Sequence, residues 1–350
     1  MIPKTKGCLL NLSLALASCV VALIVCEMAF RARYAHYFRA PQAAVMNVQS
    51  HLILHPKLGY AWQPNISYQG GIILENKDVQ FEPLSTDSNG VENIPEAIAA
   101  RGQGASVDVA GFGDSFIEHA CRGFFEAFQK EGMLYYGFAI HRQCPPQYNI
   151  LLEDYALPLK PKWVIYGLYE NDYTETEDFE NWRASGMDWF TYHSGTWCGP
   201  PVDSSRFLRF YQTHLRGTRA MFKVVAEKIG RPPQAESTDP AVNGVGKVEQ
   251  YVLRAHEMAT SHDAQFVLLI IPSKTTILKK PTLESTRNDQ LIAAVSKKGV
   301  TVLDLRPAFL NAPDKAALYY QIDGHWNRTG IDLAAKELLR IMRPAPAGTP

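Results

Sequence analysis

The sequence predicts an α/β fold in three layers, with a mostly parallel sheet of five strands between two layers of helices. From residue 105 onward, short continuous apolar runs alternate with longer segments whose apolar residues recur at helical spacing. Continuously apolar strands are typical of a parallel sheet that helices cover on both faces. The expected strands are 107–113, 133–139, 163–169, 265–271 and 301–305, and the expected helices are 117–130, 147–157, 207–229, 245–262, 289–298 and 331–342.

Composition narrows the class of protein. Hydrophobic residues make up 46% of the 350 residues, enough for a sizeable core in one large domain with additions or in two modest ones. Lys plus Arg and Asp plus Glu balance at 35 each, so nothing indicates a nucleic-acid partner. The six cysteines include no Cys-x-x-Cys pair, which argues against a zinc site, and no metal or organic cofactor is expected. One disulfide among Cys121, Cys144 and Cys198 is compatible with the sequence, which does not indicate which two would pair.

Residues 1–33 are expected to form a signal anchor with a transmembrane helix. An apolar run over residues 8–30 follows Lys4 and Lys6 and is long enough to span a bilayer, whereas a cleavable signal peptide usually has a shorter apolar region. Residues 16–19 also look like a bacterial lipoprotein box, which would place a lipid on Cys19, but the chain stays apolar beyond it. The uncut anchor is favoured, with the rest of the chain outside the cytoplasm, in the periplasm or at the cell surface.

Residues 34–104 are expected to form a small β-rich lead-in to the main domain. Residues 55–65 and 68–81 carry short alternating runs broken by Gly and Asn, which is typical of short strands. A packing role without chemistry is the preferred interpretation of this segment.

Ser115 is the first candidate for chemistry. It follows a strand that ends at Gly113 and precedes the helix expected at 117–130, so free backbone N–H groups should lie beside its hydroxyl. A nucleophile benefits from such donors, because they stabilise an oxyanion that forms next to it. The alternative is ordinary helix capping by Asp-Ser, and Gly-Asp-Ser arises by chance in roughly one chain in ten of this length.

Asp323 and His325 form the second candidate group, shortly before the helix expected at 331–342. A serine nucleophile needs a base, and a histidine base needs a group that holds its tautomer. Residues two apart in an extended segment point to the same face, so Asp323 could hold one ring nitrogen while the other faces Ser115. Taken alone, an Asp-Gly turn with a surface histidine is the simpler interpretation.

Three short blocks, in this order, resemble the GDSL or SGNH hydrolases, a superfamily of serine esterases and acyltransferases. They are Gly-Asp-Ser-Phe at 113–116, Gly-Leu-Tyr-Glu-Asn-Asp at 167–172 and Asp-Gly-His at 323–325. The resemblance covers roughly residues 105–343 and extends to membrane-anchored bacterial members through the lead-in. It implies that Ser115 is the nucleophile, that His325 is the base oriented by Asp323, and that the Asn171 side chain donates to the oxyanion.

Two blocks depart from the family pattern. The last block is Asp-x-His rather than Asp-x-x-His, and with the following Trp-Asn it resembles exported members that acetylate polysaccharides. The second block is weaker: Gly137 aligns with the family's first glycine, and Ile140 stands where the second would offer a backbone N–H. The oxyanion hole is therefore expected to comprise the Ser115 N–H, Asn171 and a donor near Gly137.

Residues 173–205 form an insertion expected to lie over the pocket as a cap. It contains several aromatic residues, Trp182, Trp189, Phe190, Tyr192 and Trp197. These could stack on a sugar ring or form the small core of the cap, and the second interpretation is favoured because aromatic side chains mostly serve burial.

The sequence thus predicts three segments, 1–33, 34–104 and 105–345, and a membrane-anchored serine esterase or O-acyltransferase acting on an ester-bearing small molecule or polysaccharide, with an acetylated cell-envelope glycan as one candidate. The rival is a non-catalytic glycan-binding or scaffold protein on the same fold, which Ile140 motivates. Geometry discriminates them, since catalysis requires Ser115 Oγ and His325 to approach to roughly 3 Å.

Overall fold

The computed structural model describes residues 18–25, 27–29, 51–73, 79–193, 240–279, 283–320 and 324–343. The chain divides into two compact units, one comprising Ala44–Pro200 and Asp239–Pro350 and the other Met1–Ala43 and Pro201–Thr238. The first unit holds the sheet and the candidate site residues that the structure describes. The helix expected at 207–229 lies outside the described residues.

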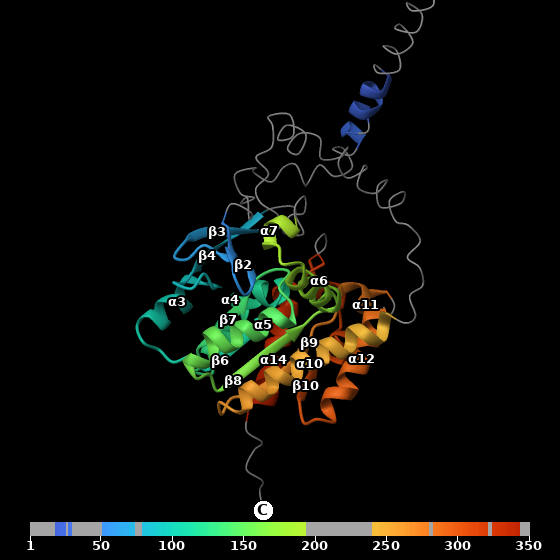
Figure 1. The fold of residues 1–350 in the computed structure, drawn as a ribbon. Coiled ribbons are helices and arrows are strands. Elements are labelled where there is room, and N and C mark those ends of the chain that lie inside the picture. The colour runs from blue at the N-terminus through green and yellow to red at the C-terminus, as the bar shows by residue number, and fades with distance from the viewer. Residues whose placement is uncertain are drawn as a thin grey trace, which may run out of the picture. The chain divides into compact units, whose positions relative to one another are not determined.

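The centre of the first unit is a parallel sheet of five strands, as the sequence predicts (Figure 1). The strand order is β10-β9-β8-β6-β7, and every neighbouring pair is parallel. All described positions of β6 and β7 are buried, which explains their continuously apolar sequences. The strands are β6 Val109–Gly113, β7 Tyr135–Ala139, β8 Trp163–Leu168, β9 Gln265–Ile270 and β10 Thr301–Asp304.

Helices cover both faces of this sheet. Helices α4 and α14 pack against each other, and α5, α6, α10 and α12 form a second contiguous group. Figure 1 shows α5 and α10 in front of the sheet and α14 behind it, so the three-layer arrangement is confirmed. The helices after β6 are α4 Ser115–Gln129, α5 Pro145–Leu151, the π-helix η2 Leu152–Ala156, the 3-10 helix η3 Leu157–Leu159, α6 Asp172–Ser185, α7 Trp189–Tyr192, α10 Pro240–Thr260, α11 Lys274–Leu278, α12 Leu283–Ser296, α13 Arg306–Leu310, the 3-10 helix η4 Ala316–Leu318 and α14 Arg328–Met342.

Two small antiparallel sheets and one helix precede the main sheet. They consist of the hairpin β1 Leu52–His55 with β2 Gly59–Trp62, the sheet of β3 Ser67–Ile73, β4 Val79–Thr86 and β5 Glu92–Asn93, and the helix α3 Pro95–Gly102. The hairpin is fixed to the main domain, because Gln147 Nε2 donates to the Leu58 carbonyl at 2.8 Å and Tyr60 Oη to the His141 carbonyl at 2.7 Å. Gly59 has φ +83°, and a Cβ there would collide with the Trp189 ring.

The amino-terminal part is described only in short pieces. Residues 18–25 and 27–29 are helical, with Val20, Val21, Ile24, Val25 and Met28 exposed. No helix within the described residues is both long and apolar enough to cross a membrane. Much of the predicted span over residues 8–30 lies outside those residues, so the transmembrane helix stays a prediction.

Candidate active site

The turn between β6 and α4 presents Ser115 as the first residue of the helix. Asp114 caps α4, its buried Oδ1 accepting the Phe116 N–H at 3.0 Å. Asp114 therefore caps the helix while Ser115 stays available as a nucleophile, so the two interpretations of this turn are compatible. The Ser115 N–H is the first in the helix and has no intrahelical acceptor, so it is suited to hold a developing negative charge.

Glycines allow α4 to lie close to the sheet at this turn. A Cβ on Gly113 would collide with Ile117 Cγ1, and one on Gly167 in the neighbouring strand β8 would lie 2.7 Å from the same atom. Ile117 therefore packs directly on two bare backbone positions. This close packing sets where the hydroxyl of Ser115 emerges at the carboxyl edge of the sheet, the edge where ligands bind in such folds.

His325 lies against the nucleophile, as the sequence predicts. Ser115 Oγ and His325 Nε2 are 2.7 Å apart, although 210 residues separate them in the chain. The imidazole packs against Phe116 and His119, with ring centroids 4.6 and 4.4 Å away. Such contacts on the ring restrict its rotation, so Nε2 keeps facing the hydroxyl. Asp323, the predicted orienting residue, lies outside the described residues.

Two hydrogen bonds fix the segment that carries His325. The buried Trp326 donates from Nε1 to the carbonyl of Phe116 at 2.9 Å, which joins the residue after the base to the residue after the nucleophile. The Tyr320 N–H donates to the His325 carbonyl at 3.0 Å. The sequence offers the Trp but not its partner, because the partner is a backbone carbonyl in another element.

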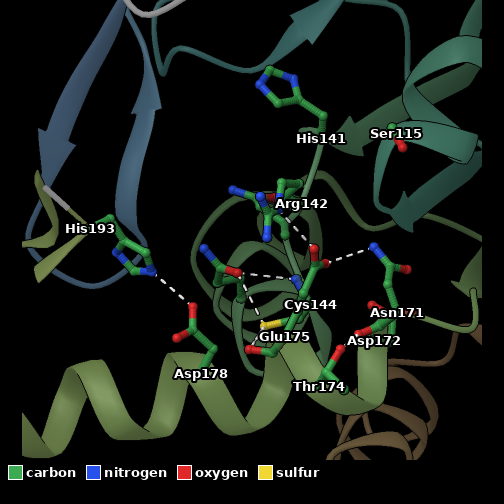
Figure 2. Close-up of polar contacts among 12 residues, drawn as sticks. Ser115, His141, Arg142, Cys144, Asn171, Asp172, Thr174, Glu175, Asp178 and His193 are labelled. Carbon is green, nitrogen blue, oxygen red and sulfur yellow. Dashed lines mark hydrogen bonds and ion pairs between the residues drawn. The ribbon is translucent and has the colours of Figure 1, made fainter. Parts of the chain in front are cut away.

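Asn171 follows β8, the strand beside β6, and precedes α6. Its Nδ2 donates to Glu175 Oε2 at 2.9 Å, and Glu175 Oε1 accepts from Arg142 Nε at 3.0 Å. Figure 2 shows Glu175 between Asn171 and Arg142. The turn is held by Asp172, whose Oδ2 accepts the Tyr169 N–H at 2.7 Å.

Gly137 does not provide the third donor that the sequence predicts. Its N–H donates to Asn93 Oδ1 at 3.0 Å, and Asn93 Nδ2 returns a bond to the Gly137 carbonyl at 2.8 Å. The reason is topological: β7 is an edge strand of the main sheet, and Asn93 of β5 satisfies its outer edge. The Ser115 N–H and the Asn171 amide remain predicted donors to an oxyanion. Ile140 is 3% exposed and packs into an apolar cluster with the lead-in.

A buried acid lies one helical turn beyond the nucleophile. His141 Nδ1 and Glu118 Oε1 are 3.2 Å apart. Burial raises the pKa of Glu118 to about 8 and lowers the pKa of His141 to about 4. The pair is therefore neutral near pH 7. No motif in the sequence marks it, since Glu118 comes from α4 and His141 follows β7.

The aromatic insertion is mostly core. Trp182 and Trp189 are 6% and 5% exposed, and their ring centroids lie 5.1 Å apart. The packing interpretation is thus confirmed for these two side chains, which join Tyr60 and Trp62 of the lead-in in one cluster. Phe190 and Tyr192 are half-buried beside it, and Trp197 lies outside the described residues.

Cys121 and Cys144 are free buried thiols with separate partners. Cys121 Sγ donates to Asn93 Oδ1 at 3.1 Å and Cys144 Sγ to Gln147 Oε1 at 3.2 Å, so they do not pair with each other. Cys198 lies outside the described residues. In the part of the chain that the structure describes, no group of three or more His, Cys, Asp or Glu side chains could hold a metal ion.

Residues 236–349 match the protein family described as "SGNH hydrolase-like domain, acetyltransferase AlgX". The matched residues make up about a third of the chain. Among solved structures, the chain is similar to a GDSL-like lipase from Bacteroides thetaiotaomicron, 12% identical, with 71% of this chain and 96% of that chain covered and a TM-score of 0.41. It is also similar to a lipase/acylhydrolase from Enterococcus faecalis, 12% identical, with 69% of this chain and all (100%) of that chain covered and a TM-score of 0.40. No curated protein is significantly similar to the chain in sequence.

Proposed function

We propose that the protein is a serine esterase or O-acyltransferase, held at a membrane with its SGNH domain outside the cytoplasm. The observation that carries the proposal is the 2.7 Å approach of Ser115 Oγ to His325 Nε2 at the carboxyl edge of the sheet. A non-catalytic binding protein would not need the Ser115 hydroxyl and the His325 imidazole to lie this close together. The burial of Trp182 and Trp189 weakens that rival further, because these rings are not available for stacking on a sugar.

In the proposed reaction, Ser115 Oγ attacks the carbonyl carbon of an ester while His325 Nε2 takes the hydroxyl proton. The negative charge on the carbonyl oxygen is accepted by the Ser115 N–H and the Asn171 amide. The carbon–oxygen bond to the leaving alcohol then breaks, and His325 returns its proton to that alcohol. In the second half, His325 deprotonates either water or a sugar hydroxyl, which attacks the acyl-serine and restores the free enzyme.

Asp323 completes the proposal as the group that orients His325. The support for it is its position two residues before the base and the resemblance of this block to the SGNH pattern. The match of residues 236–349 to an acetyltransferase family favours an acetyl group. The polysaccharide acceptor rests on the resemblance of the Asp-Gly-His block to exported members that acetylate polysaccharides.

The membrane location is part of the same proposal. It is supported by the apolar run over residues 8–30 after two lysines and by the exposed apolar side chains of residues 20, 21, 24, 25 and 28.

The test uses the full-length protein in detergent, with p-nitrophenyl acetate as the acyl donor. Ser115→Ala should lose at least about a thousandfold in kcat, whereas Ser261→Ala, at an exposed serine before β9, should keep wild-type activity. Equal activity of Ser115→Ala and wild type would remove Ser115 from the mechanism.

A fluorophosphonate probe covers the case of a transferase that accepts only its own donor. An activated serine attacks the phosphorus and expels fluoride, so mass spectrometry should find the adduct on Ser115 and none in the Ala variant. Product analysis with an added glycan then separates transfer from hydrolysis.

A further inference from the structure

Glu175 lies behind the predicted oxyanion donor and holds it. An asparagine amide has two N–H groups and one oxygen, and in isolation it rotates and flips freely. Here one N–H of Asn171 is taken by Glu175 Oε2 at 2.9 Å, in a charge-assisted hydrogen bond when the carboxyl is ionised. Because the amide is planar, this bond fixes which side of Asn171 presents its second N–H. Asn171 Oδ1 is buried and has no hydrogen bond within the described residues, and the Asn171 side chain also interacts with the Asp114 carboxyl.

Glu175 is also held by Arg142, a residue that follows strand β7. Its Oε1 accepts from Arg142 Nε at 3.0 Å, and its side chain is only 13% exposed. Arg142 follows β7 and has φ +61°, a left-handed conformation that is unfavourable for a non-glycine residue. The turn after β7 thus adopts an unfavourable conformation at the residue that reaches Glu175 on α6 (Figure 2).

We infer that Glu175 is a positioning residue, which orients the Asn171 amide toward the acyl oxygen and is clamped for that task by Arg142. The inference rests on the proposed role of Asn171 as an oxyanion donor. Glu175 touches no reacting atom and acts only through Asn171.

The ionised carboxylate accepts from both neighbours, one at each oxygen. A protonated carboxyl would offer a donor, and the Asn171 amide could then flip to accept it through Oδ1. Burial and the nearby Asp114 raise the pKa of Glu175 to about 7, while Arg142 and the Asn171 amide lower it. The other groups that face it are Asp172 on its own helix and the Cys144 thiol, which donates to the Glu175 carbonyl at 3.4 Å.

A double-mutant cycle tests whether Glu175 acts through Asn171. Glu175→Gln keeps the size of the side chain but can accept from only one of the two neighbours, so kcat for p-nitrophenyl acetate should fall about tenfold with little change in KM. In an Asn171→Ala background, the same change should alter kcat by less than about twofold. Glu177→Gln, an exposed glutamate on the same helix, is the matched control and should match wild type.

Arg142→Ala tests the clamp without altering either the carboxyl or the amide. Losing the guanidinium raises the pKa of Glu175, so the acid limb of the kcat–pH profile should move to higher pH. A purely structural role would lower the thermal stability of the variant without moving this limb.

Equal losses from Glu175→Gln in both backgrounds, or an unchanged profile in Arg142→Ala, would overturn the inference. Failure of the proposed function would look different, because Ser115→Ala would then retain activity.

Discussion

At the scale of single residues, the buried carboxyl of Glu118 makes stability depend on pH. Its pKa is raised from the ordinary 4.5 to about 8 by burial. Between these values the folded state keeps a proton that the unfolded state has lost, so the free energy of unfolding falls as pH rises and levels off above pH 8. The Glu118→Gln variant has no titrating carboxyl at this position. Its free energy of unfolding should therefore fall by about 2 kcal/mol less than that of the wild type between about pH 6.5 and about pH 8.5.

Thermal or urea unfolding at the two pH values measures this effect. This pH range lies above the range in which His141 titrates. With its pKa lowered to about 4, His141 would make the free energy of unfolding rise with pH there. The groups that face Glu118 are Glu92, His141, Asp114 and His325, and they stay in place in the variant. Glu257→Gln, at an exposed position on α10, should reproduce the wild-type pH dependence. An identical slope in Glu118→Gln would show that this carboxyl is ionised in the folded protein.

Trp326 should matter for activity more than for stability. Trp326→Phe keeps an aromatic ring in the core but removes the hydrogen bond to the Phe116 carbonyl, at a cost of about 1 kcal/mol in unfolding free energy. Because that bond sets the distance between base and nucleophile, kcat should fall roughly tenfold or more. Trp163→Phe, at a half-buried position at the start of β8, is the control. Equal kcat values in the two variants would mean that other contacts hold His325.

Site residues differed in how far sequence could predict them. Ser115 and His325 stand in short blocks whose order alone indicates chemistry, and the structure brings them together. The sequence does not show that the Gly137 N–H is taken, because its acceptor is Asn93, which lies 44 residues away in a different sheet. A donor near Gly137 stays a prediction. Alignment to a motif places a residue on a strand, but the edge contacts of that strand are a tertiary property.

At the scale of elements, the contact between α4 and the sheet depends on Ile117 lying over two glycines. Gly113→Ala adds a Cβ where Ile117 Cγ1 already lies, so the helix must shift, at a cost of about 1–3 kcal/mol. The shift would also move Ser115, and kcat should fall with stability. Gly102→Ala, where nothing lies within 4 Å of the added Cβ, should be neutral.

Truncating Ile117 is the second arm of this test. Ile117→Ala alone leaves a cavity, but in the double variant with Gly113→Ala the new methyl group occupies part of it. The two changes should therefore cost less together than the sum of their separate costs in urea unfolding. Strict additivity would contradict the predicted collision.

The strands were predictable as elements, whereas α6 was missed. The strands β6, β7, β8 and β9 are largely apolar and buried runs, which is the sequence signal of a strand covered on both faces. Helix α6 is largely acidic and polar, so the sequence indicates only an aromatic cap insertion over residues 173–205 and no helix within it. A signal was present, because the buried positions 173, 176, 179 and 182 recur at every third residue. Positions three apart drift round a helix at each step, so these four residues spread over about half of its circumference and the pattern is weak.

At the scale of the whole molecule, the site exists only when distant parts of the chain meet. Ser115, Asn171 and His325 follow different elements, and the link from Glu175 to Arg142 joins the ends of β8 and β7. Partial unfolding that separates α14 from α4 would remove the base from the nucleophile. Loss of activity and the cooperative unfolding transition are therefore expected at the same urea concentration.

The membrane prediction belongs to this scale as well, because it decides where the site can meet substrate. If residues 8–30 span a bilayer, the full-length chain expressed in a bacterial host should sediment with membranes, resist extraction by salt and dissolve in detergent. A carboxyl-terminal alkaline phosphatase fusion should be active, since that enzyme folds only outside the cytoplasm. Deleting residues 8–30 should abolish both the membrane association and the phosphatase activity of the fusion. Cys19→Ser separates the two modes of attachment. The variant stays in the membrane if a helix anchors the chain, and it is released if a lipid on Cys19 anchors it. Recovery of the full-length chain in the soluble fraction with an inactive fusion would contradict the anchor, and any polysaccharide outside the cytoplasm would then be ruled out as substrate.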